Sequence, residues 1–308
     1  MAARDEVQVA FGDTLTIHDG ESLSPWSDVW RAEVHGGDAP VAAVVKRTWG
    51  SPEPLDAWQR TLVARGIRTV APLTAAVEID GEVWVAYPLL SGRPWDGGAA
   101  DLAAAGTLLG RMHAASTGVV IDGFPGFEWG SAERSSVDDD IEALRDSAAT
   151  HWPAADTSRW VAQLEAFPET LERMRAADVT LAPVSLDLRA ANVLFDDAGA
   201  LMVDLENAAL APRVLDLALS ALLFPLEHAG AGGSALGGEE WAAFRDAYVA
   251  ECPLTAQERE AWPLALTYMK LEWGTWHLTE DVESEPDGNL GFLEDLLTLD
   301  EHDRFPLA

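Results

Sequence analysis

The sequence predicts an α+β protein of two lobes, a small strand-rich lobe followed by a larger, mainly helical one. The chain has 308 residues, more than a single hydrophobic core usually serves. Short segments rich in β-branched residues dominate the first 90 residues, whereas Ala- and Leu-rich segments with helical spacing dominate the remainder. We therefore expect an N-terminal lobe at residues 1–90 and a C-terminal lobe at residues 91–308.

The N-terminal lobe is expected to hold an antiparallel sheet and one helix. Its predicted strands are short, are bounded by Gly, Asp or Pro, and span residues 14–18, 29–34, 41–46, 74–79 and 82–87. Asp80-Gly81, between the last two strands, is a strong signal for a hairpin turn. The helix is expected at residues 55–65, after two prolines and before Gly66.

The C-terminal lobe is expected to be mainly helical around one short pair of strands. Helices are predicted at residues 99–116, 138–148 and 157–176, and again after the strands. The later helices are interrupted by a Gly-rich stretch at 230–238. The strands are expected at 193–195 and 201–203, joined by a turn at 196–199.

The formal net charge of -32 excludes nonspecific nucleic-acid binding, which needs a basic surface. The negative charge would attract cationic partners if it lines a cleft; alternatively, it solubilises the surface or reflects a salt-adapted or GC-rich genome. Only Lys46 and Lys270 are lysines, and the other basic residues are arginines. A chain that nearly excludes Lys makes both positions candidates for a specific role.

We expect a cytoplasmic protein with no membrane segment. No run of 18 apolar residues is present, and the first residues have no apolar stretch of the signal-peptide kind. Cys252 is the only cysteine, so a disulfide within the chain and a cysteine-based zinc site are excluded.

The segment from Val184 to Glu206 carries the strongest functional pattern. Asp187 and Asn192 are five residues apart on an apparent loop, and Asp204 ends the second short strand. Phosphoryl transfer needs a carboxylate that orients the attacking hydroxyl and accepts its proton, and oxygen ligands that hold Mg²⁺ on the phosphates. Each of the three residues alone is also a common turn residue, but the spacing between these elements favours a phosphotransferase site.

This segment resembles the aminoglycoside phosphotransferase and choline kinase family, which has a protein-kinase-like fold. The matching stretches are Asp187…Asn192-Val-Leu, Val203-Asp-Leu-Glu206 and Val214-Leu-Asp-Leu-Ala218, with Leu108…His113-Ala as a further helix. The resemblance implies a two-lobed kinase that uses ATP and Mg²⁺. It implies that Asp187 is the catalytic base, that Asn192 and Asp204 are Mg²⁺ ligands, and that Asp216 supports the catalytic loop. His113 is expected to be a hydrogen-bonded core histidine.

The chain departs from the family pattern directly before the predicted base. The family has His-Gly there, and this chain has Ser185-Leu186. One alternative is therefore a catalytically impaired kinase-fold protein that binds nucleotide and acts as a regulator; another is a phosphohydrolase that uses the clustered acids. Arg189, inside the loop, either screens the phosphate or faces solvent.

The nucleotide site is expected in the N-terminal lobe. Lys46 ends the third predicted strand, where kinases carry the Lys that pairs with the α- and β-phosphates. Its acidic partner stays open, because Glu53 and Asp56 are not at the family's usual place. The stretch 86–90 would be the hinge, with backbone groups of Ala86 and Pro88 pairing with adenine, and residues 23–31 the turn over the phosphates. The choice between ATP and GTP stays open.

The acceptor is expected to be a small, cationic molecule such as an amino sugar or a choline-like amino alcohol. Trp273 and Trp276 would share a helix face, with Glu272, Glu280, Asp281 and Glu283 close by. Aromatic faces and carboxylates recognise organic cations, and we assign Trp273, Trp276 and Glu280 to acceptor binding. The alternative is that the tryptophans are core and the acids a solvated surface. The oligomeric state stays open.

Overall fold

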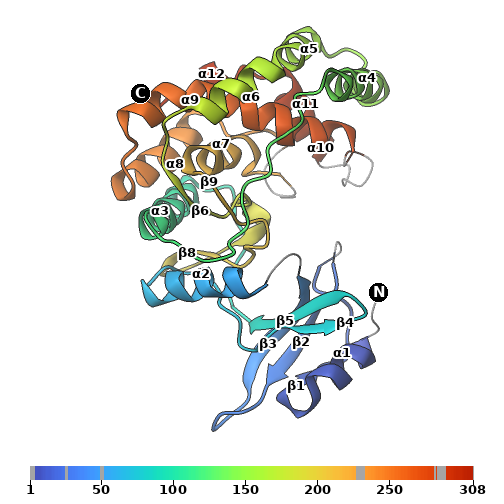
Figure 1. The fold of residues 1–308 in the computed structure, drawn as a ribbon, viewed down its shortest axis with the longest axis vertical. Coiled ribbons are helices and arrows are strands. Elements are labelled where there is room, and N and C mark those ends of the chain that lie inside the picture. The colour runs from blue at the N-terminus through green and yellow to red at the C-terminus, as the bar shows by residue number, and fades with distance from the viewer. Residues whose placement is uncertain are drawn as a thin grey trace.

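The computed structural model describes residues 4–24, 27–48, 52–226, 233–280, 282 and 289–307. Figure 1 shows a twisted sheet at one end of the molecule and a layered group of helices at the other, with α2 between them. This arrangement confirms the predicted α+β class. In the part of the chain that is described, no helix is both long and apolar enough to cross a membrane.

The sheet at the N-terminal end has five antiparallel strands in the order β1-β2-β3-β5-β4. Its strands and flanking helices are α1 (Arg4–Phe11), β1 (Leu15–Ile17), β2 (Val29–Val34), β3 (Val41–Thr48), α2 (Pro52–Ala64), β4 (Val77–Ile79) and β5 (Glu82–Pro88). Every predicted strand is present, and boundaries differ by up to three residues. β3 lies at the centre, where Lys46 is paired with Val29 on one side and Val85 on the other.

Alternation along the strands separates the two faces of this sheet. Trp30 of β2 and Trp84 of β5 stack at 5.0 Å on one face, above a small core that α1 covers with Val7 and Phe11. Because side chains alternate along a strand, Lys46 lies on the opposite face, together with Val85 and Tyr87.

Helix α1 corrects the prediction that this lobe has one helix. Its eight residues place only Val7 and Phe11 in the core, four positions apart. So short a helix has little intrinsic stability, and its apolar pattern is too brief to stand out in the sequence. The Trp-lined face of the sheet stabilises it by burial.

Helix α2 lies within the first 90 residues but packs on the core of the helical part. Leu55, Trp58 and Leu62 are buried in the same cluster as α3 (Ala99–Ser116). The Trp58 indole Nε1 donates a hydrogen bond of 2.9 Å to Ser116 Oγ. The boundary at residue 90 therefore stays a prediction, since α2 contributes to both sides.

The helical part surrounds two short two-stranded ribbons, β6 with β9 and β7 with β8. After α3, its elements are α4 (Arg134–His151), α5 (Ser158–Glu165), α6 (Phe167–Ala176), β6 (Leu181–Val184), β7 (Val193–Asp196), β8 (Gly199–Met202), β9 (Ala209–Pro212), α7 (Arg213–Leu223), α8 (Gly238–Glu251), α9 (Ala256–Met269), α10 (Thr275–Thr279), α11 (Leu290–Thr298) and α12 (Glu301–Arg304).

Two of the predicted helices are interrupted. The helix expected at 157–176 is divided into α5 and α6, because Pro168 occupies the first turn of α6. Between α9 and α10 the chain forms a π-turn, Lys270–Gly274, in place of a regular helix. Of the Gly-rich stretch predicted at 230–238, residues 230–232 lie outside the described residues, and the rest leads into α8, which begins at Gly238.

Helices α3 and α8 pack closely because α3 carries glycines where the two backbones meet. A β-carbon on Gly106 would come within 2.1 Å of the Phe244 carbonyl oxygen, and one on Gly110 within 2.7 Å of the Tyr248 carbonyl oxygen. Side-chain atoms cannot be accommodated at either position without separating the helices.

We predict that Gly106→Ala lowers the free energy of unfolding by about 1–3 kcal/mol, because the added methyl group overpacks the α3–α8 contact. Chemical denaturation measures the loss. Ala114→Ser is the control, since it adds one atom to an exposed position of the same helix and should stay within about 0.5 kcal/mol of wild type. Equal stability of the two variants would contradict the close packing.

Candidate active site

The predicted base Asp187 lies in the loop between β6 and β7 and is almost buried, with 7% of its surface exposed. Both of its carboxylate oxygens accept hydrogen bonds. Arg189 Nε donates to Oδ1 at 2.5 Å, and Asn207 Nδ2 donates to Oδ2 at 3.0 Å. Arg189 therefore contacts the base directly and does not simply face solvent, while its screening of the phosphate stays a prediction. Asn207 was not predicted from the sequence; its place three residues after Asp204 is the only signal it offers.

Asn192 and Asp204 lie at the same end of the β7–β8 ribbon. Val193 pairs with Met202, and the Val203 amide donates to the Asn192 carbonyl at 3.0 Å, so the residues on either side of the ribbon meet. Asn192 Nδ2 donates to the Asp187 backbone carbonyl at 3.1 Å. Its amide oxygen and the Asp204 carboxylate are hard oxygen ligands of the kind that Mg²⁺ prefers.

Lys46 of β3 contacts two acidic residues that follow β8, Asp204 and Glu206. Its Nζ lies 2.7 Å from Asp204 Oδ2 and 3.1 Å from Glu206 Oε1. Burial opposes the charged ammonium, but the carboxylates of Asp204 and Glu206 outweigh it and raise the pKa of Lys46. Burial in turn raises the pKa of the Glu206 carboxyl, which Lys46 opposes and Asp204 reinforces.

The acidic partners of Lys46 therefore come from the helical part of the molecule, and not from α2. Asp56 forms an ion pair with Arg60, one turn further along α2, at 2.6 Å. Gln59, the buried polar residue of α2, is an amide and carries no charge. Glu206 belongs to the sequence pattern Asp-Leu-Glu, but nothing in the spacing of that pattern indicates that the Glu206 side chain faces Lys46.

A buried carboxyl group, Asp216 of α7, holds the start of the catalytic loop. It is fully buried and accepts hydrogen bonds from the Ser185 amide at 2.9 Å and from Ser185 Oγ at 3.0 Å. His113 Nε2 of α3 lies 3.0 Å from the same carboxyl group, and His113 Nδ1 lies 2.9 Å from the Tyr248 hydroxyl. His113 is thus a core histidine with two partners, as predicted, and Asp216 contacts the loop as expected.

The residue before the base has an unusual backbone. Leu186 has a φ of 51°, in the left-handed region that favours glycine, and only 3% of its surface is exposed. It occupies the position of Gly in the family's His-Gly-Asp pattern.

The predicted hinge residues lie at the end of β5. The Ala86 amide donates to Thr74 Oγ1 at 3.2 Å, and the Ala86 carbonyl accepts from the Leu73 amide at 2.8 Å. Pro88 has no amide hydrogen and can only accept a hydrogen bond. The assignment of both residues to adenine stays a prediction. Of the predicted turn over the phosphates, Pro25 and Trp26 lie outside the described residues.

A cavity of about 540 Å³ lies beside the predicted base. Glu206 and Asn207 line it, and these residues contact Lys46 and Asp187 respectively. The rest of its wall comes from α2, the stretch after α3, the catalytic loop, the start of β9 and the π-turn: Leu55, Gly123, Pro125, Gly126, Phe127, Glu128, Leu186, Ala208, Ala209 and Trp273. We call it the catalytic cavity.

A second cavity of about 240 Å³ lies next to it, lined by Trp276, Glu280, Glu272 and Asp140 among others. Both cavities are bounded by the stretch 123–136 and by the segment 271–280, and a β-carbon on Gly130 would come within 2.0 Å of Glu272 Oε2. Burial, followed by the charge of Asp140, raises the pKa of Glu272 to about 7. We call it the acidic cavity.

The π-turn corrects the prediction that Trp273 and Trp276 share a helix face. Trp273 lies in the turn and lines the catalytic cavity, whereas Trp276 follows it in α10, is 47% exposed and lines the acidic cavity. The wider helical turn changes the angle between the two side chains. Asp281 and Glu283, expected nearby, lie outside the described residues.

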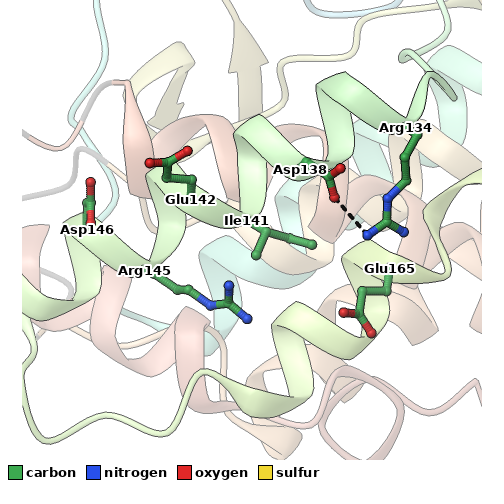
Figure 2. A pocket seen from close by; sticks show the side chains of 7 residues that line it. All are labelled: Arg134, Asp138, Ile141, Glu142, Arg145, Asp146 and Glu165. Atoms are coloured by element: carbon green, nitrogen blue, oxygen red, sulfur yellow. Dashed lines mark ion pairs between the residues drawn. The ribbon is translucent and has the colours of Figure 1, made fainter.

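A further pocket between α4 and α5 is lined by side chains of both charges (Figure 2). Arg134 pairs with Asp138 at 2.7 Å along one edge. Both helices lie at the end of the molecule farthest from the sheet (Figure 1), and none of the predicted site residues lines this pocket.

Comparison with known protein families gives a match that covers the catalytic segment. The profile of the phosphotransferase enzyme family matches residues 48–260. The match includes Asp187, Asn192, Asp204 and Asp216 but neither Lys46 nor the tryptophans of the two cavities. A comparison with curated protein sequences gives no significant match.

Several solved structures share the fold. An amicoumacin kinase, hAmiN, has a TM-score of 0.63 at 16% identity, over 94% of this chain and 92% of that one. Choline kinase LicA from Streptococcus pneumoniae has a TM-score of 0.58 at 14% identity, over 94% and 95%. An aminoglycoside phosphotransferase from Alicyclobacillus acidocaldarius has a TM-score of 0.55 at 15% identity, over 93% and 87%. These neighbours confirm the protein-kinase-like fold.

The family profile covers more than half of the chain and includes the whole catalytic segment. It confirms the resemblance that this segment suggested. The chain therefore belongs to the phosphotransferase enzyme family and is a small-molecule kinase.

Proposed function

We propose that this kinase transfers the γ-phosphoryl group of ATP, held with Mg²⁺, to a hydroxyl group of a small cationic molecule. One observation carries the proposal. Lys46 from the sheet, Asp204 from the ribbon and Asp187 from the loop are joined through Glu206 and Asn207, which both line the catalytic cavity. The cation and the proton acceptor that the reaction needs are thus each held by a residue that lines the same cavity. The neighbouring amicoumacin kinase structure contains AMP-PNP and Ca²⁺, which supports a nucleotide and a divalent metal.

Each residue has a separate task in this proposal. Lys46 binds the α- and β-phosphates, and Asn192 and Asp204 hold the metal, which neutralises charge on the phosphates when bound. Asp187 orients the acceptor hydroxyl and accepts its proton. Arg189 and Asn207 fix the Asp187 carboxylate, so that little motion is left to it when the hydroxyl arrives. Adenine would lie at the end of β5, near Ala86 and Pro88.

The acceptor would lie with its reacting hydroxyl in the catalytic cavity. Trp273 lines this cavity, and Trp276 and Glu280 line the acidic cavity beside it. A positive group on the acceptor would be held by the aromatic faces and the carboxylates, and the -32 net charge would attract it over distance. The choline kinase and aminoglycoside phosphotransferase neighbours act on molecules of this kind by name.

The alternative of a catalytically impaired regulator rests on the replaced His-Gly pair. Ser185 still bonds to Asp216 through its amide and its hydroxyl, so the loop keeps its support without that His. Asp187, Asn192 and Asp204 are all present. We therefore favour an active enzyme.

We predict that Asp187→Asn lowers kcat by about 10²–10⁴-fold, because the amide cannot accept the hydroxyl proton. Mg-ATP affinity should stay nearly unchanged, since Asp187 faces the acceptor and not the metal. Steady-state kinetics and calorimetry measure the two quantities. A variant that keeps more than a few per cent of wild-type kcat would show that another group is the base.

We predict that Asp204→Ala weakens Mg-ATP binding at least about tenfold, since a loss of 1.4 kcal/mol is tenfold in affinity and a charged ligand is removed. Titration of Mg-ATP by calorimetry tests it. The control is Asp197→Ala, which removes an exposed carboxylate from the turn of the same ribbon. If affinity and Mg²⁺ dependence equal those of the control, the metal is held elsewhere.

We predict that Trp276→Ala or Glu280→Gln raises the acceptor KM and leaves the KM for ATP unchanged. An aromatic–cation contact contributes about 0.5–2 kcal/mol, which selects a charged amine over a neutral isostere by up to about thirtyfold. Higher salt should also weaken acceptor binding, because exposed charges are screened beyond about 8–10 Å. Glu142→Gln is the control, since it removes an exposed acid that lines the pocket between α4 and α5 and not the acidic cavity. A preferred acceptor that is neutral or anionic would exclude this mode of recognition.

The acceptor KM should also fall as the pH rises through about 7. Burial and the charge of Asp140 raise the pKa of Glu272 to about 7. Its carboxyl group is therefore mostly protonated and neutral below that pH, and mostly ionised above it. Only the charged form attracts a cation. The pH profile of the acceptor KM measures this, and Glu272→Gln should reduce the dependence. Any part that remains is expected from Glu206, which lines the catalytic cavity and whose pKa burial also raises to about 7.

A further inference from the structure

The backbone of the catalytic loop is strained at one residue. Leu186 has a φ of 51°, and a residue with a β-carbon is less stable in this conformation than glycine. Among the described non-glycine residues only Asp80, in the tip of the β4–β5 hairpin, shares a positive φ. Such strain persists where the surrounding structure imposes it, and it is concentrated at functional sites.

The side chain of Leu186 lies in the wall of the catalytic cavity. It is 3% exposed and bounds the cavity together with Asn207, whose amide holds the Asp187 carboxylate. Trp273 and Phe127 line the same cavity. A glycine, which would relieve the backbone, would leave this part of the wall open beside the predicted base.

Leu186 and Leu188 both pack in the main hydrophobic core, but only Leu186 also lines the catalytic cavity. Leu188, two residues further along the same loop, is fully buried, lies outside the cavity lining and has no positive φ. The loop is thus already anchored in the core by an unstrained leucine. Leu186 adds an apolar surface that faces the cavity.

We propose that Leu186 is a specificity-determining residue. Its side chain restricts the space beside Asp187, so that an unhindered hydroxyl fits and bulkier acceptors are excluded, and its apolar surface offers no hydrogen bond that would hold a water molecule there. This inference rests on the proposed function. Its chemical consequence concerns a side reaction. When water replaces the acceptor, its oxygen forms a bond to the γ-phosphorus while the bond to the bridging β-phosphate oxygen breaks. ADP and inorganic phosphate are released, and the water proton passes through Asp187 to solvent.

The first experiment compares Leu186→Gly and Leu186→Ala with wild type in Mg-ATP without acceptor. Both variants should release ADP faster, by roughly tenfold. This factor is of the order by which one methylene group changes the selectivity of an apolar pocket. The same variants are then offered 3-amino-1-propanol and 1-amino-2-propanol, isomers with a primary and a secondary hydroxyl. Relative kcat/KM should shift toward the secondary alcohol by a similar factor.

Leu188→Ala and Leu188→Gly are matched controls, because they remove a buried leucine from the same loop away from the cavity. They should lose stability without faster ADP release. Thermal melting supplies an independent readout of strain. At position 186 the Gly variant should melt about 2 °C above the Ala variant, whereas at position 188 the Ala variant should melt higher.

The specificity role would be overturned if both Leu186 variants bind the nucleotide as well as wild type but release ADP no faster. It would also be overturned if the two alcohols are phosphorylated and the preference between them does not change. An Ala variant more stable than the Gly variant at position 186 would overturn the strain. If wild type turns over no ATP with or without amines, the proposed function fails and the specificity role fails with it, while the melting order still decides the strain.

Discussion

The buried carboxyl group of Asp216 is the contact on which the catalytic geometry depends. A carboxyl group removed from water is costly unless its oxygens are hydrogen-bonded, and here the Ser185 amide, the Ser185 hydroxyl and His113 surround it. These contacts fix the chain two residues before Asp187. Because α3 supplies His113 and α7 supplies Asp216, the position of the predicted base is set by the packed helices and does not depend on the loop alone.

From this anchor, the active residues form a chain of short contacts that ends in the sheet. Asn207 joins Asp187 to the segment that follows β8, residues 204–207. Asp204 and Glu206 of the same segment hold Lys46. Partly buried opposite charges interact more strongly than surface pairs, and removing one partner leaves an uncompensated charge. Lys46 is therefore held by the helical part of the molecule. Its orientation relative to Asp187 is set by the same segment that lines the catalytic cavity.

The catalytic segment and the sheet could be predicted from the sequence, because spacing and alternation are local signals. Asn192 contacts the Asp187 backbone and lies at the same end of the β7–β8 ribbon as Asp204, as the spacing around a hairpin requires. Other features depend on tertiary structure. Helix α1 has too few apolar residues to be recognised and forms because the Trp30–Trp84 face must be covered. The π-turn leaves no mark in a helical pattern. It is stabilised by buried contacts of Lys270 with Glu301 and Gln163 at 3.0 Å, from residues distant in the sequence.

The replaced His-Gly pair shows how a fold can keep a site while its sequence changes. The support that a histidine at position 185 would give comes from a serine that still reaches Asp216, and from His113 beside it. The glycine is replaced at a real cost, because Leu186 keeps the left-handed backbone without being glycine. A loop held only by local contacts would relax into a more favourable conformation. This loop cannot, since Asp216 fixes it on one side and Leu188 is buried on the other. The rigidity that places Asp187 is thus also what allows a bulky side chain to be held against the catalytic cavity.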